Sequence, residues 1–141
     1  MTTEFLVRFI RQHRLAVLAT TSRGLRPEAA VVGIAVTDDL EIVFDTVRAS
    51  RKYPNLIECP RVALAIGWKQ ETTVQYEGIA GELAGPEDDG YREVYYSVYP
   101  DGRERLATWE GLVHFVVRPQ WIRYSNFNEP VRIEEMRFEL P

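Results

Sequence analysis

The chain has 141 residues, of which 45% are hydrophobic and 27% are charged, and its formal net charge is −4. This composition is that of an ordinary globular protein, so we expect neither disorder nor a second large domain, and we predict one domain over residues 1–141. The acidic balance argues against a nucleic-acid partner, because phosphate backbones require a basic surface.

The first half of the chain predicts one helix followed by strands. Phe5, Leu6, Phe9 and Ile10 recur at helical spacing with polar residues between them, which predicts an amphipathic helix over residues 3–13, within an N-terminal helical segment 1–14. Apolar runs separated by turn signals then predict strands. These strands cover residues 15–20, 29–36, 41–45, 62–68 and 72–83.

The second half predicts another helix and the end of a barrel. Gly78 and Gly81 lie inside the long strand and indicate a bulge or a sharp bend. Pro86 is followed by acidic residues, as at a helix start, and this helix should end near Val98. Strands follow at residues 112–117 and 121–124, and residues 125–141 are expected to be a polar C-terminal tail. Short strands with few helices indicate an antiparallel barrel with helices packed outside it.

The side chains alone offer little catalytic chemistry. The chain contains two histidines, His13 and His114, and neither lies beside a motif that would activate a serine. Two separate histidines and one cysteine do not give the ligand spacing of a metal site. We therefore predict no metal site and leave the catalytic residues unknown. If the protein is an enzyme, a cofactor should supply the reactive atoms.

The sequence also bears on the compartment. Cys59 cannot form an internal disulfide and has no CxxC companion. Residues 1–5 do not resemble the basic start of a leader, and no run approaches the ~18 apolar residues that span a bilayer. We expect a soluble, cytoplasmic protein without a membrane partner.

A short basic loop is the most informative segment. An apolar strand is followed by a short loop that carries Thr46, Ser50, Arg51 and Lys52, and a short predicted helix comes after this loop. With Arg48, this loop gathers two hydroxyls and three cations in an acidic protein. Hydroxyls and cations at the start of a helix suit a phosphate, and a solvated basic turn is the alternative.

The order of residues around this loop is similar to the flavin-phosphate segment of the pyridoxamine 5'-phosphate oxidase family. The matching positions are Pro27, Phe44-Asp45-Thr46, Ser50-Arg51-Lys52, Pro60-Arg61-Val62 and Trp68, with weaker matches at Glu77-Gly78 and Pro119-x-Trp121-x-Arg123. This resemblance implies an antiparallel split β-barrel of the FMN-binding type. It also implies a homodimer with FMN in a groove at the subunit interface.

The resemblance implies roles for individual residues. It would make Thr46, Ser50, Arg51 and Lys52 ligands of the FMN phosphate or ribityl chain. The family's glutamine near the flavin ring falls at Thr73, and the late segment would bring Trp121 or Arg123 to the ring from across the dimer.

Three departures from the family pattern weaken the expected flavin site. Ala30 and Ala35 stand where the oxidases carry an Arg and a Lys, and Asp45 replaces a tyrosine beside the phosphate loop. Because charge-assisted contacts to phosphate are the strong ones, their loss should weaken FMN binding. We expect a divergent FMN-dependent oxidoreductase acting on a small-molecule substrate. The alternatives are a deazaflavin-dependent reductase of the same fold and a non-enzymatic ligand-binding or stress-associated dimer.

Overall fold

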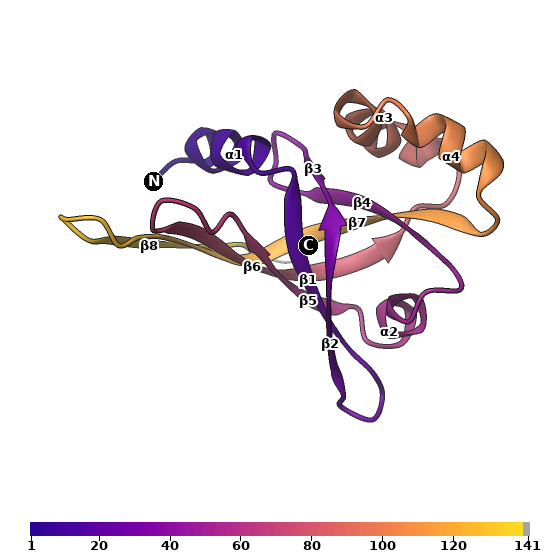
Figure 1. Cartoon of the computed structure of the whole chain (residues 1–141), viewed down its shortest axis with the longest axis horizontal. Helices are drawn as coiled ribbons and strands as arrows, with labels where there is room; N and C mark the ends of the chain where they lie inside the picture. The colour runs from indigo at the N-terminus through magenta and orange to yellow at the C-terminus, as the bar shows by residue number, and fades with distance from the viewer. Residues whose placement is uncertain (140–141) are drawn as a thin grey trace.

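The computed structural model describes residues 1–139 and places its strands in one curled antiparallel sheet with helices outside it (Figure 1). The strands are β1 (Leu15–Thr21), β2 (Pro27–Gly33), β3 (Ala35–Val36), β4 (Ile42–Val47), β5 (Arg61–Ile66), β6 (Thr72–Glu82), β7 (Leu112–Asn126) and β8 (Arg132–Arg137). Their order across the sheet is β2-β1-β5-β6-β7-β4-β3, and β8 pairs with β7. The helices are α1 (Thr3–Gln12), α2 (Lys52–Glu58), the 3₁₀ turn η1 (Pro86–Asp88), α3 (Asp89–Val98) and α4 (Gly102–Thr108). The predicted split-barrel architecture with flanking helices is confirmed.

Helix α1 forms where the apolar spacing predicts it. The hydroxyl of Thr2 accepts a hydrogen bond from the backbone N–H of Phe5 at 3.1 Å and caps the first turn. Leu6, Phe9 and Ile10 are buried on the side that faces the sheet. Among residues 1–139, no helix is long and apolar enough to cross a bilayer.

The sheet separates two clusters of buried side chains. The larger cluster fills the concave side and includes Phe44 of β4 and Phe115 of β7, whose rings stack at 5.6 Å. A smaller cluster lies under α3, where Val43 and Tyr95 are buried. Because side chains alternate along a strand, neighbouring residues of β4 face different clusters.

The strand predicted at residues 29–36 is divided in two. β2 ends at Gly33 and pairs with β1, whereas β3 begins at Ala35 and pairs with β4. Between them Ile34 is buried, and its backbone N–H donates to the carbonyl of Arg14 at 2.9 Å. This change of partner carries the chain from one edge of the curled sheet to the other.

The bulge expected near Gly78 is present. The register of β6 against β7 shifts between Glu77 and Gly78, and a side chain at position 78 would collide with the backbone carbonyl of Arg118. Pro119 lies at this irregularity, where a residue without an N–H is tolerated. The two strands predicted at residues 112–117 and 121–124 are therefore one bent strand, β7.

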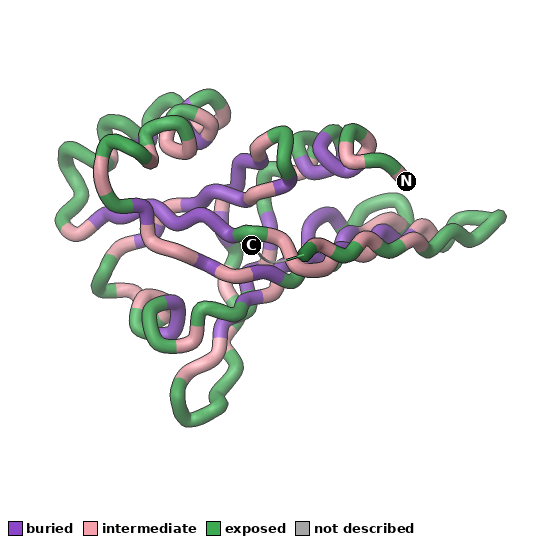
Figure 2. The backbone as a smooth tube through the Cα atoms, turned by 180° about the vertical axis from the view of Figure 1, so that it is seen from behind, coloured by how far each residue is buried: buried purple, intermediate pink, exposed green. Residues whose placement is uncertain are grey.

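The C-terminal segment is not the unpaired polar tail that the sequence suggested. Within it, β8 pairs with residues 121–126 of β7 and forms a ribbon that projects from the barrel (Figures 1 and 2). Most β8 residues are exposed, so no apolar alternation marked this strand. Cross-strand ion pairs such as Arg123–Glu135 support it instead. Residues 140 and 141 of the predicted tail lie outside the described residues.

Candidate functional site

Three of the predicted phosphate ligands lie together. Thr46 is buried near the end of β4, on the same side as Phe44, and its hydroxyl is 3.0 Å from that of Ser50. The ammonium of Lys52 donates to the Thr46 hydroxyl oxygen at 3.3 Å. We call Thr46, Ser50 and Lys52 the hydroxyl–lysine cluster. Its hydroxyls and ammonium group are of the chemical type that binds phosphate oxygens.

The cations around this cluster differ in how they are neutralised. Arg51 is exposed and lies 3.7 Å from the carboxylate of Glu28, and Arg48 lies 3.6 Å from that of Glu82. Lys52 makes no ion pair with any residue between 1 and 139. The lysine is therefore the cation of this loop whose charge is most available to an anion.

The two nearby carboxylates are held in place, and sequence reasoning missed both of them. The side-chain amide of Asn55 donates to Glu28 at 3.2 Å and to the hydroxyl of Thr20 at 3.1 Å, which ties α2 to β1 and β2. The phenol of Tyr53 donates to Glu82 at 2.5 Å. Glu28 shares its side of β2 with the buried Val32, so alternation along this strand was the available signal.

Asp45 does not lie where the sequence comparison suggested. It points to the opposite side of β4 from Thr46 and forms an ion pair with Arg105 of α4 at 3.3 Å. Arg105 also contacts the hydroxyl of Tyr95 at 3.3 Å. The expectation of a negative charge from Asp45 at the phosphate loop is therefore wrong, and the alternation of side chains along β4 is the physical reason.

His114, opposite Asp45 in the neighbouring strand, is part of this same buried polar group. It is 3% exposed, and its Nε2 atom makes no hydrogen bond with the described residues. Burial lowers the pKa of His114, and the charge of Asp45 partly offsets that effect. The described residues contain no group of three or more potential metal-ligating side chains.

The other three predicted cofactor ligands are on the outer side of the sheet. Trp121 and Arg123 alternate with the core residue Ile122, and Thr73 lies on the adjacent strand β6. The guanidinium of Arg123 lies over the Trp121 ring at 5.2 Å. Both side chains donate to Glu135 of β8, from the Trp121 indole at 3.2 Å and from Arg123 Nε at 3.0 Å. Within one protomer, these residues do not share a site with the hydroxyl–lysine cluster.

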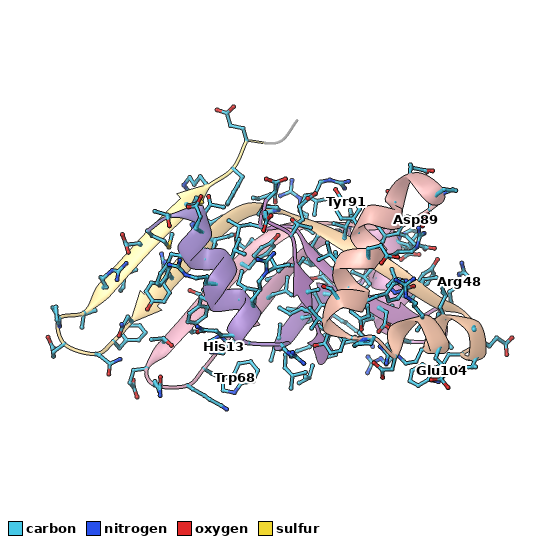
Figure 3. The ribbon with its side chains drawn as sticks, turned by 90° about the horizontal axis from the view of Figure 1, so that it is seen from above. His13, Arg48, Trp68, Asp89, Tyr91 and Glu104 are labelled. Carbon is cyan, nitrogen blue, oxygen red and sulfur yellow. The ribbon has the colours of Figure 1, made fainter. Side chains whose placement is uncertain are left out.

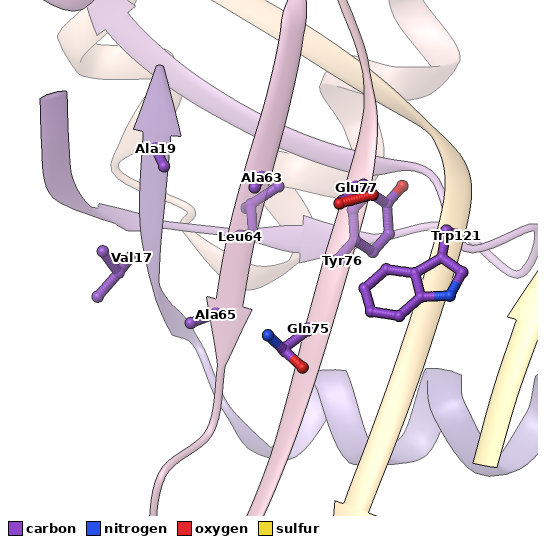
Figure 4. A pocket seen from close by; sticks show the side chains of 9 residues that line it. All are labelled: Val17, Ala19, Ala63, Leu64, Ala65, Gln75, Tyr76, Glu77 and Trp121. Atoms are coloured by element: carbon purple, nitrogen blue, oxygen red, sulfur yellow. The ribbon is translucent and has the colours of Figure 1, made fainter. Parts of the chain in front are cut away.

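The outer side of the sheet also carries an open apolar surface. A shallow depression of about 210 Å³ lies over β1, β5, β6 and β7, with the Trp121 ring at one side (Figure 4). Its lining is mostly small and apolar and includes Val17, Ala19, Ala63 and Ala65. Val31, which pairs with Val17 in the next strand, is 62% exposed. We call this region the outer face.

The two alanines that replace family cations have different surroundings. Ala30 is half-buried and shares its side of β2 with Glu28 and Val32. Ala35 is 3% exposed and packs in the smaller cluster under α3. Because Ala35 faces that cluster, a side chain at this position is directed away from the hydroxyl–lysine cluster.

The curled antiparallel sheet with its flanking helices has the architecture of the split-barrel proteins. The sequence profile of the pyridoxamine 5'-phosphate oxidase family matches residues 2–126, and the chain belongs to this family. A pyridoxine/pyridoxamine 5'-phosphate oxidase of Ehrlichia ruminantium is 35% identical over 89 residues, which cover 62% of this chain and 46% of that protein. The chain thus spans less than half the length of this curated relative.

Solved structures share the fold at lower identity. A heme binding protein from Mycobacterium smegmatis superposes with a TM-score of 0.80 at 18% identity, over 97% of this chain and 58% of that one. A pyridoxamine 5'-phosphate oxidase-related, FMN binding protein from Nostoc punctiforme superposes with a TM-score of 0.67 at 10% identity, over 97% and 94% of the two chains. The fold is therefore shared by proteins described as binding different cofactors.

Proposed function

We propose that this protein is a dimeric, FMN-dependent oxidoreductase of the pyridoxamine 5'-phosphate oxidase family that acts on a small molecule. The observation that carries the proposal is the hydroxyl–lysine cluster, in which Lys52 has no carboxylate partner among residues 1–139. Family membership supports FMN over other phosphate-bearing ligands. Bound FMN would supply the hydride or electron chemistry that the side chains of this chain lack.

The donor set fits a phosphate, although it is less basic than the family pattern. Thr46 and Ser50 offer hydroxyl donors, and Lys52 offers a charge-assisted contact. Arg51 is 86% exposed and only 3.7 Å from Glu28, so we assign it a smaller contribution. With alanine at positions 30 and 35, we expect an affinity below that of an oxidase with the full set of cations.

A complete flavin site requires a second protomer in this proposal. Trp121 and Arg123 lie on the outer side of the sheet, whereas Thr46 points to the concave side. A two-fold axis through the outer face would bury Val31 and the alanines of β1 and β5. The contribution of one protomer's Trp121 to the other's flavin site is supported by the family resemblance, in which the late segment reaches the ring from across the dimer. The location in the cytoplasm, predicted from the sequence, stays part of this proposal.

A titration of the purified protein with FMN, followed by visible absorbance and flavin fluorescence, tests the proposal. We expect saturable binding of one FMN per chain and weaker binding of riboflavin, because riboflavin lacks the phosphate that Lys52 would contact. Absence of FMN binding would contradict the proposal. A deazaflavin cofactor titrated in parallel tests the second redox candidate.

The non-enzymatic alternative has one specific observation in its favour. Glu28 and Glu82 place two carboxylates beside the cations of the phosphate loop, and both oppose an added anion. If neither FMN nor the deazaflavin binds and the protein is still a folded dimer, this alternative replaces the proposed redox function.

A further inference from the structure

A second pocket lies apart from the hydroxyl–lysine cluster, where the end of α1 meets the turn between β5 and β6. It has a volume of about 350 Å³ and is lined by Gln12, His13, Arg14, Leu15, Gly67, Trp68 and Lys69. Figure 3 shows the labelled His13 and Trp68 beside one another at this end of α1. Trp68 is a matching position of the family's flavin-phosphate segment, but the sequence assigned none of these residues as a cofactor ligand. A volume of this size accommodates a small ligand.

The charge of this pocket is opposite to that of the whole protein. Its lining contains Arg14 and Lys69 and no carboxylate, in a chain with net charge −4. Neither cation forms an ion pair with any residue from 1 to 139. Two exposed cations without internal partners at one concave site favour an anion.

The nearby helix end does not repel that anion as strongly as a bare C-terminus would. The ring of His13 contacts the carbonyl oxygen of Phe9 through Nδ1 at 2.7 Å. Because a carbonyl only accepts, Nδ1 carries the proton in this contact, and the imidazole covers one of the last free carbonyls of α1. The backbone N–H of His13 covers another, the carbonyl of Ile10, at 2.9 Å.

The aromatic side chain of the pocket, Trp68, is exposed, and the preceding turn determines its position. Trp68 is 55% exposed, which is unusual for so large an apolar side chain. Gly67 before it has φ +75°, and a Cβ there would lie 2.9 Å from the Phe9 ring and 3.1 Å from His13. Only glycine therefore lets the turn approach α1 this closely, and this approach positions the indole at the pocket.

We propose that this pocket is a binding site for a small planar aromatic carboxylate. The aromatic ring would stack on Trp68, and the carboxylate would pair with Arg14 and Lys69, with the guanidinium offering a two-point contact. The concave shape and the small number of cations favour a small anion over an extended acidic partner. The site is separate from the proposed FMN site and does not depend on it.

Isothermal titration calorimetry with 2-naphthoate as the probe tests this site, carried out on the full chain with saturating FMN present and again without FMN. We expect one probe molecule per chain in both conditions, with a dissociation constant on the order of 0.1–1 mM for so few contacts. Trp68→Ala should weaken binding at least about tenfold, whereas Trp109→Ala is the matched control, since Trp109 is also 55% exposed but lies outside this pocket.

The charge contribution is tested separately. The double variant Arg14→Ala/Lys69→Ala should weaken the binding of 2-naphthoate about tenfold. It should leave the binding of 2-naphthylmethanol, a neutral probe that binds more weakly, unchanged. Arg26→Ala, at an exposed position outside the pocket, is the control and should alter the binding of neither probe. The five side chains substituted in these two experiments are all exposed, so circular dichroism should show intact folds. The proposal is overturned if 2-naphthoate does not bind, or if Trp68→Ala and Trp109→Ala have equal effects. It is also overturned if light scattering shows that Trp68→Ala converts the dimer to a monomer and 2-naphthoate does not bind the unmodified protein. In that case the surface around Trp68 is a subunit interface.

Discussion

Asp45 of β4 and Arg105 of α4 form an ion pair, with 3.3 Å between the carboxylate and the guanidinium. The pair lies on the side of β4 opposite Thr46. Both side chains are less than one-fifth exposed. The position that departs from the family pattern therefore fastens the α3–α4 helices to the sheet, and it leaves the phosphate loop without a carboxylate from this strand.

We predict that Asp45→Asn lowers stability without changing FMN affinity. Arg105 keeps its contacts to Asp101 and Tyr95, and we expect a loss of about 1.5–3 kcal/mol, the range for a hydrogen bond to a charged group. Urea unfolding measures the first effect and an FMN titration the second. A tenfold change in FMN affinity in a folded variant would place Asp45 at the flavin site and contradict the assignment.

Lys52→Ala should weaken FMN much more than riboflavin. A contact between ammonium and phosphate contributes about 1.5–3 kcal/mol, which corresponds to roughly ten- to a hundredfold in affinity. Arg51→Ala is the matched variant and should have a smaller effect, because Arg51 is exposed and already lies beside Glu28. Equal losses for FMN and riboflavin in Lys52→Ala would show that the lysine does not contact the phosphate.

The two alanine positions should respond in opposite ways to a cation. Ala30→Arg adds a side chain on the half-buried side of β2 that carries Glu28, and we expect it to fold and to bind FMN more tightly, severalfold or more. Ala35→Lys places a charge in the cluster under α3, so we expect a destabilisation of about 3 kcal/mol or more and no gain in affinity. Thermal melts and FMN titrations of both variants check this. A stable Ala35→Lys protein with improved FMN binding would mean that β3 is wrongly placed.

His114 should make the stability of the protein depend on pH. Burial lowers its pKa in the folded state, so the unfolded chain binds a proton more readily, with a pKa of about 6.5. The resulting contribution is fully favourable to folding above about pH 6.5 and is lost as the pH falls toward the lower pKa of the folded state. Unfolding free energies of the protein and of His114→Leu between pH 5 and 8 should therefore diverge in slope below pH 6.5. Parallel curves would contradict this role.

The sequence predicted much of the fold because the strands with one buried side carry apolar alternation. Helix α1, the bulge at Gly78 and the short strands around the phosphate loop all follow from local patterns. The sequence did not predict β8, because its exposed residues lack that alternation, or α4, because this helix is short and polar. The turn between β5 and β6 was predicted at residues 69–71, but β5 ends earlier, at Ile66, and Gln70 and Glu71 in the turn adopt positive φ.

The candidate site was predicted less completely than the fold. The hydroxyl–lysine cluster follows from the spacing of Thr46, Ser50 and Lys52 along the chain. The carboxylates of Glu28 and Glu82 come from other strands, so their approach to the loop depends on sheet register and not on local sequence. The separation of Trp121 from the cluster likewise appears only once the two sides of the sheet are known.

The most direct test of the proposed function is complementation between two defective protomers. Lys52→Ala should weaken the phosphate side of the site, and Trp121→Ala should weaken the ring side that the partner contributes. Each variant homodimer should therefore bind little FMN at a concentration that saturates the unmodified protein. After subunit exchange in an equal mixture, half of the dimers carry both variants and each has one intact site, so FMN binding should recover to about a quarter of the unmodified level. Recovery measured by flavin fluorescence would support a site shared across the dimer, and a mixture that binds no more FMN than the two variants do separately would contradict it.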